Sequence, residues 1–322
     1  MDGRIKAIRR SEEGHQAMIG KDSMFKALPF EDLGEGGLNA PRYSISDLGE
    51  FEFFQSEGAA QYRYDYGGKP LDCLFLKEES DTLIVSFHGA LNRKRFSLPR
   101  YERLKSVSKF GTNSIYFSDP TLWIDDSIQL AWYTGWGEVD VQADIAKLIT
   151  KARIAAGASK VIVSGSSGGG FAALQVSALI PDSVAVVFNP SVYVQGYLVD
   201  GKEGGHGTER KYLEVVRPEV LPVPASQYQF DIDWASEVGD KVSALERYAI
   251  PRENYVLFCQ TPTDWHYDQH YLPFLAACAK GDNLARIRVH EYGERVGHFP
   301  PTPQEFDEAM AEALRWAEEI QG

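Results

Sequence analysis

Short apolar runs alternate with segments of helical periodicity over most of the chain. From residue 82 onward the runs are almost continuously apolar, as in TLIVSF (82–87) and VAVVF (184–188), which is typical of strands buried on both faces of a parallel sheet. The strand candidates are 82–87, 114–117, 161–165, 184–188, 255–259 and 285–290, and the helical patterns lie near 97–109, 139–156, 169–180, 240–248, 269–280 and 303–320. This order predicts a doubly wound α/β core with a mostly parallel sheet.

Two regions depart from this alternation. Segments 51–57, 61–66 and 71–76 are short, rich in aromatic residues and separated by Gly/Pro turns, which predicts N-terminal antiparallel strands. We expect residues 1–50, with their glycine-rich turn at 34–37, to be an N-terminal extension that docks on the core or forms a partly mobile arm. The main domain would then span 51–322, with a cap or lid insertion at about 190–250.

Composition narrows the function classes. The chain has 33 Lys+Arg and 46 Asp+Glu among 322 residues, a net charge of −13, and we find no Lys/Arg-rich run that could override this locally. Nucleic-acid binding is therefore disfavoured. Cys73, Cys259 and Cys278 are far apart and form no CxxC pair, which fits a reducing compartment. We see no signal peptide and no apolar stretch of about 18 residues, so we expect a soluble, cytoplasmic protein without a membrane span.

The most informative segment is VIVSGSSGGGFAAL (161–174), where an apolar run meets Gly165-Ser166-Ser167-Gly168-Gly169 and then a helix-forming stretch. A nucleophile on such a tight strand-to-helix turn needs small neighbours two positions away. Its hydroxyl lies near free N–H groups of the helix N-terminus, which stabilise a developing oxyanion. Ser167 is thus the candidate nucleophile. A glycine-rich phosphate cradle is the alternative, but the Lys-Ser/Thr of a P-loop and the spacing of GxGxxG are both missing.

With this GxSxG turn between a strand and a helix, followed along the chain by an acidic residue and a histidine after later strands, the sequence resembles the α/β-hydrolase superfamily of serine esterases and acyl hydrolases. The resemblance implies a triad in the order nucleophile, acid, histidine, each at the end of a successive core strand. His298, in the loop GERVGHFPPT after the last strand candidate, matches the place of the base. Asp264 follows the preceding strand and is favoured as the acid, while Asp268, the alternative, falls where a helix should begin and is explained by capping.

The segment TPTDWHYDQHY (261–271) also supports a rival chemistry. His266 and His270 are spaced i, i+4 and would share a helix face with Asp268, a set of groups that binds zinc. No HExxH pattern is present and aromatic residues interleave, so we favour packing or substrate contacts and predict no metal and no organic cofactor.

Two further features suggest how a substrate would be held. His88-Gly89-Ala90-Leu91 resembles the loop that forms half of the oxyanion hole in esterases and lipases of this superfamily, so the hole would combine the N–H of Gly168 with that of Ala90, or of Leu91. Trp132 and Trp136 lie in an aromatic loop after the second core strand and are candidates for substrate stacking, which suits sugar faces or acyl chains.

Together these residues predict a serine hydrolase that cleaves a carboxylic ester, of a small molecule or an acylated glycan, through an acyl-enzyme on Ser167. The same triad would serve an O-acyltransferase, which passes the acyl group to an acceptor hydroxyl. A third reading is a non-catalytic protein of this fold that binds a ligand or partner. The sequence leaves the natural substrate, the acceptor and the oligomeric state open.

Overall fold

The computed structural model describes residues 25–32, 39–197, 207–221, 223–227, 232–293 and 295–321. Its strands are β1 (Phe25–Asp32), β2 (Asn39–Ile45), β3 (Gly58–Asp65), β4 (Pro70–Lys77), β5 (Thr82–Phe87), β6 (Asn113–Phe117), β7 (Lys160–Ser166), β8 (Val184–Phe188), β9 (Tyr255–Gln260) and β10 (Ile287–Glu291). Its α-helices are α3 (Leu104–Val107), α4 (Val141–Ala156), α5 (Gly168–Ser177), α6 (Gly207–Val216), α7 (Ala235–Val238), α8 (Ala244–Tyr248), α9 (Leu272–Lys280) and α10 (Pro303–Gln321). A π-helical turn, Tyr267–Tyr271, precedes α9.

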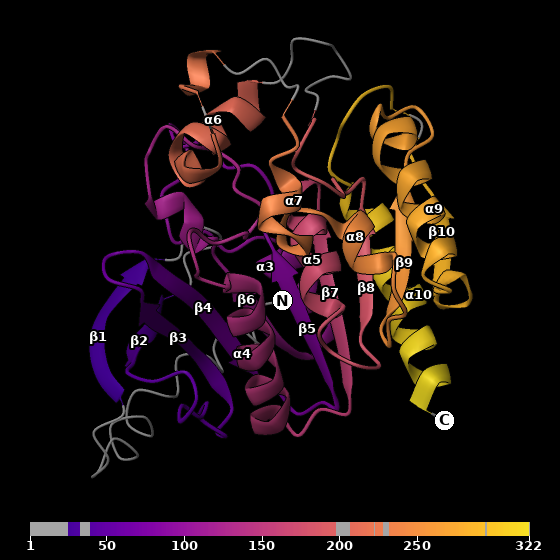
Figure 1. The fold of residues 1–322 in the computed structure, drawn as a ribbon. Helices are drawn as coiled ribbons and strands as arrows, with labels where there is room; N and C mark the ends of the chain where they lie inside the picture. The colour runs from indigo at the N-terminus through magenta and orange to yellow at the C-terminus, as the bar shows by residue number, and fades with distance from the viewer. Residues whose placement is uncertain are drawn as a thin grey trace.

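Within the described residues the strands form one sheet of ten, in the order β1-β2-β3-β4-β6-β5-β7-β8-β9-β10 (Figure 1). The six strands from β6 to β10 run parallel, as their continuous apolar runs predict. In a parallel sheet all carboxyl ends meet at one edge, and ligand sites of open α/β folds lie there. The loops after β5, β7, β9 and β10 therefore converge on the same edge.

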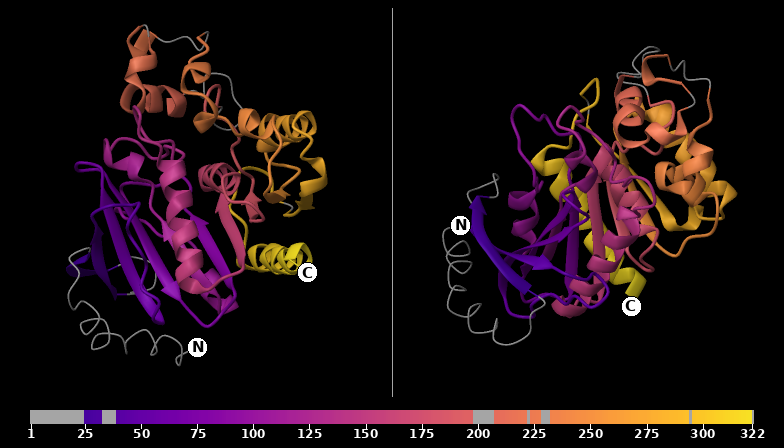
Figure 2. Two further views of the ribbon diagram at one scale, coloured as in Figure 1. Left: turned by 60° about the horizontal axis from the view of Figure 1, so that its bottom comes forward. Right: turned by 60° about the vertical axis from the view of Figure 1, so that its left-hand side comes forward.

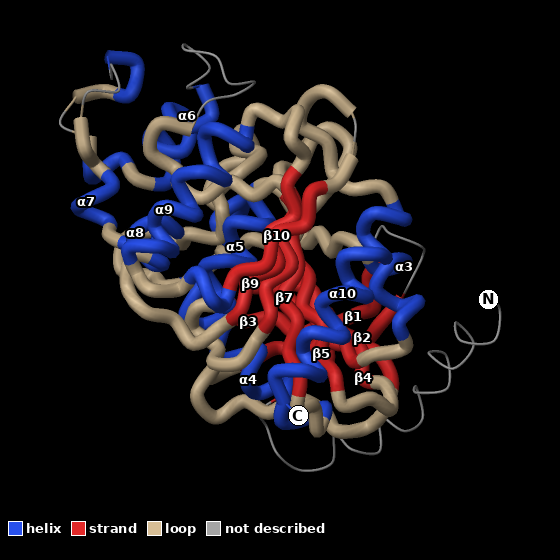
Figure 3. The backbone as a smooth tube through the Cα atoms, turned by 90° about the vertical axis from the view of Figure 1, so that its right-hand side faces the viewer, coloured by secondary structure: helices blue, strands red, loops and turns tan. Residues whose placement is uncertain are grey.

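Helices cover both faces of the parallel strands (Figure 3). On one face α4, α5, α8 and α9 enclose the larger hydrophobic core. On the other face α3 and α10 close a second core, to which α10 contributes Phe306, Met310 and Trp316. Because both faces are buried, the α/β prediction with a mostly parallel sheet is confirmed.

The N-terminal strands differ in part from the sequence prediction. β3 and β4 form the expected antiparallel hairpin, seen with β1 and β2 as the indigo strands of Figure 2. Residues 51–57, however, form no strand; Phe51 and Phe53 instead pack their rings against Tyr62. The place beside β3 is taken by β2, which runs parallel to it, so the sheet begins before the boundary expected at residue 50. The glycine-rich turn at 34–37 lies outside the described residues.

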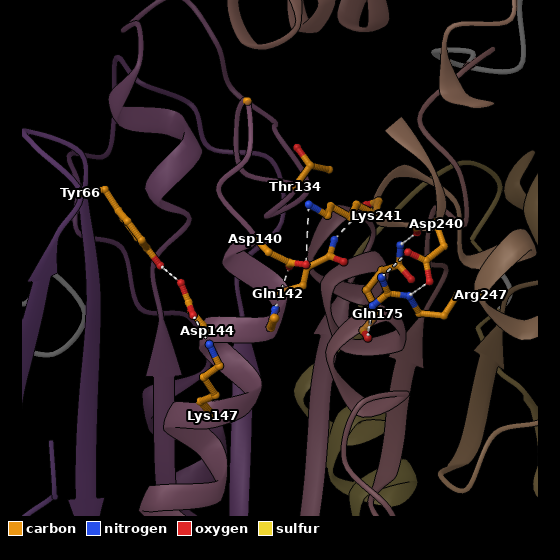
Figure 4. A network of polar contacts seen from close by, with 12 residues as sticks. Tyr66, Thr134, Asp140, Gln142, Asp144, Lys147, Gln175, Asp240, Lys241 and Arg247 are labelled. Atoms are coloured by element: carbon orange, nitrogen blue, oxygen red, sulfur yellow. Dashed lines mark hydrogen bonds and ion pairs between the residues drawn. The ribbon is translucent and has the colours of Figure 1, made fainter. Parts of the chain in front are cut away.

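The segment between β8 and β9, where the sequence predicts an insertion, carries α6, α7 and α8. Its last part returns to the core through a polar network (Figure 4). The guanidinium of Arg247 donates to both carboxylate oxygens of Asp240, at 2.8 and 3.0 Å, and to the carbonyl of Gln175 in α5 at 2.9 Å. Gln142 in α4 donates to the carbonyl of Lys241 at 2.9 Å. The returning chain is thereby fixed to α4 and α5, the helices that precede and follow β7 in the chain.

We expect Arg247→Ala to lower the free energy of unfolding by about 2 kcal/mol, because it leaves a buried carbonyl and a carboxylate without their charged donor. Lys147→Gln is the matched control: Lys147 pairs with Asp144 in the same network, but its side chain is 60% exposed, so we expect a loss below about 0.5 kcal/mol. Urea unfolding of the two variants measures both values, and equal losses would contradict the anchoring role of Arg247.

Candidate active site

Ser167 lies on a sharp turn between β7 and α5, at the carboxyl edge of the sheet. Its backbone has φ 52° and ψ −119°, a region that non-glycine residues rarely occupy. The N–H of Ser167 donates to the carbonyl of Phe188 at 3.0 Å, and its carbonyl accepts from Phe171 and Ser191. These bonds hold the turn in its strained form, as in other functional sites where neighbouring structure determines an unfavourable backbone.

Two glycines make this turn possible, as the GxSxG spacing predicts. A Cβ on Gly165 would overlap the carbonyl group of Gly169. A Cβ on Gly169 would lie 2.6 Å from the carbonyl oxygen of Phe87, at the end of β5. The nucleophile turn therefore packs backbone against backbone on its neighbouring strand, and only glycine fits at either position.

The structure brings together Asp264 and His298, which the sequence predicts as acid and base. His298 Nδ1 lies 2.7 Å from Asp264 Oδ2, and the other carboxylate oxygen accepts the N–H of His266 at 2.9 Å. Asp264 is buried, whereas the His298 side chain is 18% exposed. Because a carboxylate only accepts, Nδ1 carries the proton and Nε2 is left as a base. Asp268 is exposed at the start of the π-helical turn.

Asn189 connects the loops that carry these two residues. It follows β8 in a left-handed conformation, φ 42°, and its amide donates to Thr261 Oγ1 at 3.2 Å and to the carbonyl of Phe299 at 3.3 Å. Its side-chain oxygen accepts the N–H of Thr261 at 2.8 Å. One buried side chain thus fixes the acid loop, three residues before Asp264, and the histidine loop, one residue after His298.

The far end of the histidine loop is also fixed. Arg103 donates to the carbonyl of Pro301 at 3.0 Å. Thr302 and Glu305 then form a reciprocal capping box, in which each side chain accepts the other residue's N–H, and α10 begins at Pro303. His298 is consequently held between two anchored points.

The loop after β5 is clamped so that one amide stays available. Gly89 donates its N–H to Glu102 at 3.1 Å, and Leu91 donates its N–H to the carbonyl of Gln129 at 2.7 Å. Within the described part of the chain the N–H of Ala90 makes no hydrogen bond, and Ala90 is exposed. Of the two amides the sequence leaves open, this arrangement favours Ala90. Gly89 lies directly against the nucleophile turn.

His88 orients this loop rather than taking part in proton transfer. Its Nε2 accepts the N–H of Asp119 at 3.1 Å, so Nδ1 carries the proton and donates to the carbonyl of Gly89 at 2.8 Å. Burial, with the nearby cations of Arg100 and Arg93, lowers the pKa of His88 to about 4. In a trans peptide the N–H points opposite to the carbonyl. A neutral His88 therefore sets the direction of the Ala90 amide.

The hydroxyl of Ser167 makes no hydrogen bond to any residue that the structure describes. Long contacts between nucleophile and base are common before a substrate binds, because the bond tightens only in the complex. Ser167 is half-buried and His298 retains an exposed edge. Neither side chain is therefore fully enclosed by the surrounding protein.

The stacking role suggested for Trp132 and Trp136 is not supported by their positions. Trp132 is fully buried, donates from Nε1 to Ser191 Oγ at 2.9 Å and packs edge-on against Tyr212 of α6. Trp136 lies apart from it, against Tyr66 and beneath the ammonium of Lys69. Trp132 thus packs α6 onto the core and Trp136 packs against the β3–β4 turn, which explains these aromatic residues without a ligand.

The rival zinc set of His266, His270 and Asp268, which the sequence disfavours, does not come together. His266 and His270 are close, with ring centroids 4.3 Å apart, and both are fully buried. Asp268 is exposed and does not join them. Among the described residues the group with metal-ligand spacing is instead Asp264, His266 and His298, whose ligand atoms all lie within 4.8 Å of one another.

Sequence reasoning missed several residues of this site. Asn189 and Glu102 act through contacts between loops that are far apart in the chain, so no local pattern marks them. Also missed was a short basic stretch after the loop that begins at His88, which holds Arg93, Lys94, Arg95, Arg100 and Arg103. Two of its members serve the fold: Arg103 holds the histidine loop and Arg93 pairs with Asp126.

Comparison with known proteins identifies the fold. No protein-family model and no curated protein sequence matches the chain, but many solved structures do. The capsule O-acetyltransferase of Neisseria meningitidis serogroup A is 16% identical, with a TM-score of 0.51 over 80% of this chain and 93% of that one. The acylaminoacyl peptidase of Pyrococcus horikoshii is 12% identical, with a TM-score of 0.51 over 82% of this chain and 41% of that one. The chain has the α/β-hydrolase fold.

A third similar structure is the glycosylation-associated protein complex of Streptococcus agalactiae, 12% identical with a TM-score of 0.55. The match covers 80% of this chain and 46% of the Streptococcus agalactiae chain. This chain therefore spans less than half the length of that protein. At these identities the comparisons establish the α/β-hydrolase fold, and the chemistry has to be argued from the site. None of the described helices combines the length and apolar character needed to cross a bilayer.

We expect the free energy of unfolding to fall steeply as the pH drops from 6.5 to 4.5. Burial lowers the pKa of His88 to about 4, of His270 to about 3 and of His266 well below its usual value, so the unfolded chain binds three more protons in this range. Burial raises the pKa of Asp119 to about 6, which offsets one of them. A net two protons give a slope of roughly 3 kcal/mol per pH unit.

Urea unfolding at pH 7.5, 6.5, 5.5 and 4.5 measures this slope. The pKa values of the three buried histidines in the folded protein lie below those in the unfolded chain. Their contribution to the free energy of unfolding is therefore complete above pH 6.5 and is lost on acidification. A free energy of unfolding that stays constant down to pH 5 would show that the three histidines are not buried as neutral groups.

Proposed function

We propose that this α/β-hydrolase-fold protein is a serine acyl hydrolase that cleaves a carboxylic ester through an acyl-enzyme on Ser167. The observation that carries the proposal is the 2.7 Å contact between buried Asp264 and His298, at the sheet edge where Ser167 occupies its strained turn. A buried carboxylate that fixes the tautomer of a partly exposed histidine is the arrangement that activates a serine.

In this mechanism His298 Nε2 takes the Ser167 proton as the hydroxyl attacks the ester carbonyl. Asp264 holds Nδ1 and stabilises the imidazolium that forms. The negative charge that develops on the carbonyl oxygen is received by the N–H groups of Gly168 and Ala90. His298 then protonates the leaving alcohol, and a water activated by the same imidazole hydrolyses the acyl-enzyme. The reaction requires no cofactor.

A second candidate is an O-acyltransferase, in which an acceptor hydroxyl replaces water in the last step. The similarity to a capsule O-acetyltransferase along nearly all of that protein's length supports it. Both reactions share the acyl-enzyme, so product analysis separates them: an acylated alcohol or sugar formed in the presence of that acceptor favours transfer. A purely binding role gains no benefit from a buried acid paired to a histidine next to an exposed serine.

A fluorophosphonate probe should form one covalent adduct with the wild-type protein, detected by intact-protein mass spectrometry. Ser167→Ala should form none, because only this hydroxyl lies on the turn beside the oxyanion amides. Ser166→Ala is the matched control, one residue earlier at the end of β7, and should be labelled like the wild type. Labelling of Ser167→Ala, or no labelling of a folded wild type, would contradict the proposal.

Asp264→Asn should lower kcat for a p-nitrophenyl ester by about 10³–10⁴, because an amide cannot hold the productive histidine tautomer. Asp268→Asn, four residues further along, should stay within about threefold of wild type, because that side chain is exposed. Steady-state kinetics on both variants decide between the two acids, and the reverse ranking would assign the role to Asp268.

A further inference from the structure

A third ionisable side chain lies against the Asp264–His298 pair. The ring of His266 has its centroid 4.2 Å from that of His298, and the residue is completely buried. One potential ligand atom from each of Asp264, His266 and His298 lies within 4.8 Å of the other two. The mechanism above uses the carboxylate and the imidazole of His298, whereas it gives the side chain of His266 no task.

The hydrogen bonds of His266 determine which nitrogen is free. Nδ1 lies 2.9 Å from the carbonyl oxygen of Asn189, and because a carbonyl only accepts, Nδ1 carries the hydrogen. Nε2 therefore presents a lone pair. This atom is buried and has no hydrogen-bond partner among the described residues. Buried polar atoms are nearly always paired, so an unpaired acceptor beside two other potential ligands points to a ligand.

The neighbouring His270 shows the opposite arrangement. Its Nδ1 accepts the N–H of Val192 at 3.3 Å, so its Nε2 carries the hydrogen. A protonated nitrogen offers no lone pair for a metal, so His270 Nε2, which is also buried without a hydrogen-bond partner among the described residues, is a donor and not a ligand. By distance, too, His270 lies outside the trio. The two histidines thus differ in chemistry although they are spaced i, i+4 and are equally buried.

We propose that Asp264, His266 Nε2 and His298 Nδ1 form a site for a divalent transition metal of the zinc class, and that its occupancy switches off the serine chemistry. Two imidazole nitrogens and one carboxylate oxygen are a common zinc ligand set, with solvent in the fourth position. Ligand bonds of about 2.0–2.1 Å in tetrahedral geometry separate ligand atoms by about 3.3 Å. The 2.7 Å contact between His298 and Asp264 therefore has to open by about 0.6 Å, and the other pairs, which lie within 4.8 Å, have to close by at most about 1.5 Å.

The inhibition follows from the tautomer of His298 and rests on the proposed function. In the metal-free protein Nδ1 carries the hydrogen and Nε2 is the base. When the metal takes the lone pair at Nδ1, the neutral imidazole carries its hydrogen on Nε2: one proton leaves Nδ1, one is taken up at Nε2, and none is released overall. Nε2 then donates instead of accepting, so it cannot take the Ser167 proton.

Binding is tested first, without reference to activity. Ser167→Ala protein should bind one Zn²⁺ in a calorimetric titration and give the visible absorption of tetrahedral Co²⁺. Adding His266→Phe should weaken binding by about 100-fold or more, because one of three protein ligands is lost. His290→Gln is the matched control for adventitious binding: His290 lies on β10 and pairs with Glu312 of α10, so its loss should leave the affinity unchanged. Absent binding, or equal affinity with and without His266, overturns the site.

Inhibition is tested on the protein with Ser167 intact. Zn²⁺ should block fluorophosphonate labelling of the wild type, EDTA should restore it, and His266→Phe should be labelled with or without Zn²⁺. His266→Gln provides a second variant if the first does not fold, as judged by circular dichroism. Zinc-insensitive labelling of the wild type overturns the switch. Metal binding in a protein that never reacts with the probe would instead overturn the proposed function while supporting the site.

Discussion

The close backbone contact between the nucleophile turn and the end of β5 is the constraint on which the rest of the site depends. Gly169 approaches the carbonyl of Phe87 at a distance that excludes any side chain. This contact brings the turn of Ser167 beside the loop that begins at His88, so the two amides that would receive an oxyanion come from neighbouring strands. The strain in the Ser167 backbone is maintained because hydrogen bonds from β8 and the following loop fix it on both sides.

A second set of constraints converges on Asn189. Its left-handed backbone turns the chain at the end of β8, and its amide binds both the acid loop and the histidine loop. The carbonyl of the same residue fixes the tautomer of His266. The relative positions of acid, base and the additional histidine thus depend on one side chain and its own peptide group, which has no ionisable atom and no part in the chemistry.

The fold could be predicted from the sequence where strands are buried on both faces of the sheet. Apolar runs such as 184–188 have no exposed face and read directly as parallel strands, and the order of Ser167, Asp264 and His298 along the chain predicts a meeting point because carboxyl ends of parallel strands share an edge. Residues 51–57 were misread because aromatic residues favour strands equally when they fill a core from a loop. Trp132 was misread for a related reason, since sequence does not show that α6 covers it. The roles of Asn189 and His266 depend on individual hydrogen bonds between distant loops, and the sequence does not show which atoms will be partners in the folded protein.

The contacts of Trp132 connect the inserted segment to Ser167. Tyr212 of α6 packs on the indole, the indole nitrogen donates to the hydroxyl of Ser191, and the N–H of Ser191 donates to the carbonyl of Ser167. A continuous series of direct contacts therefore joins the strained turn of Ser167 to α6, a helix outside the sheet. A ligand or partner that displaces α6 would therefore change the environment of Ser167 from a distance, so the position of this helix and the geometry of the turn are coupled.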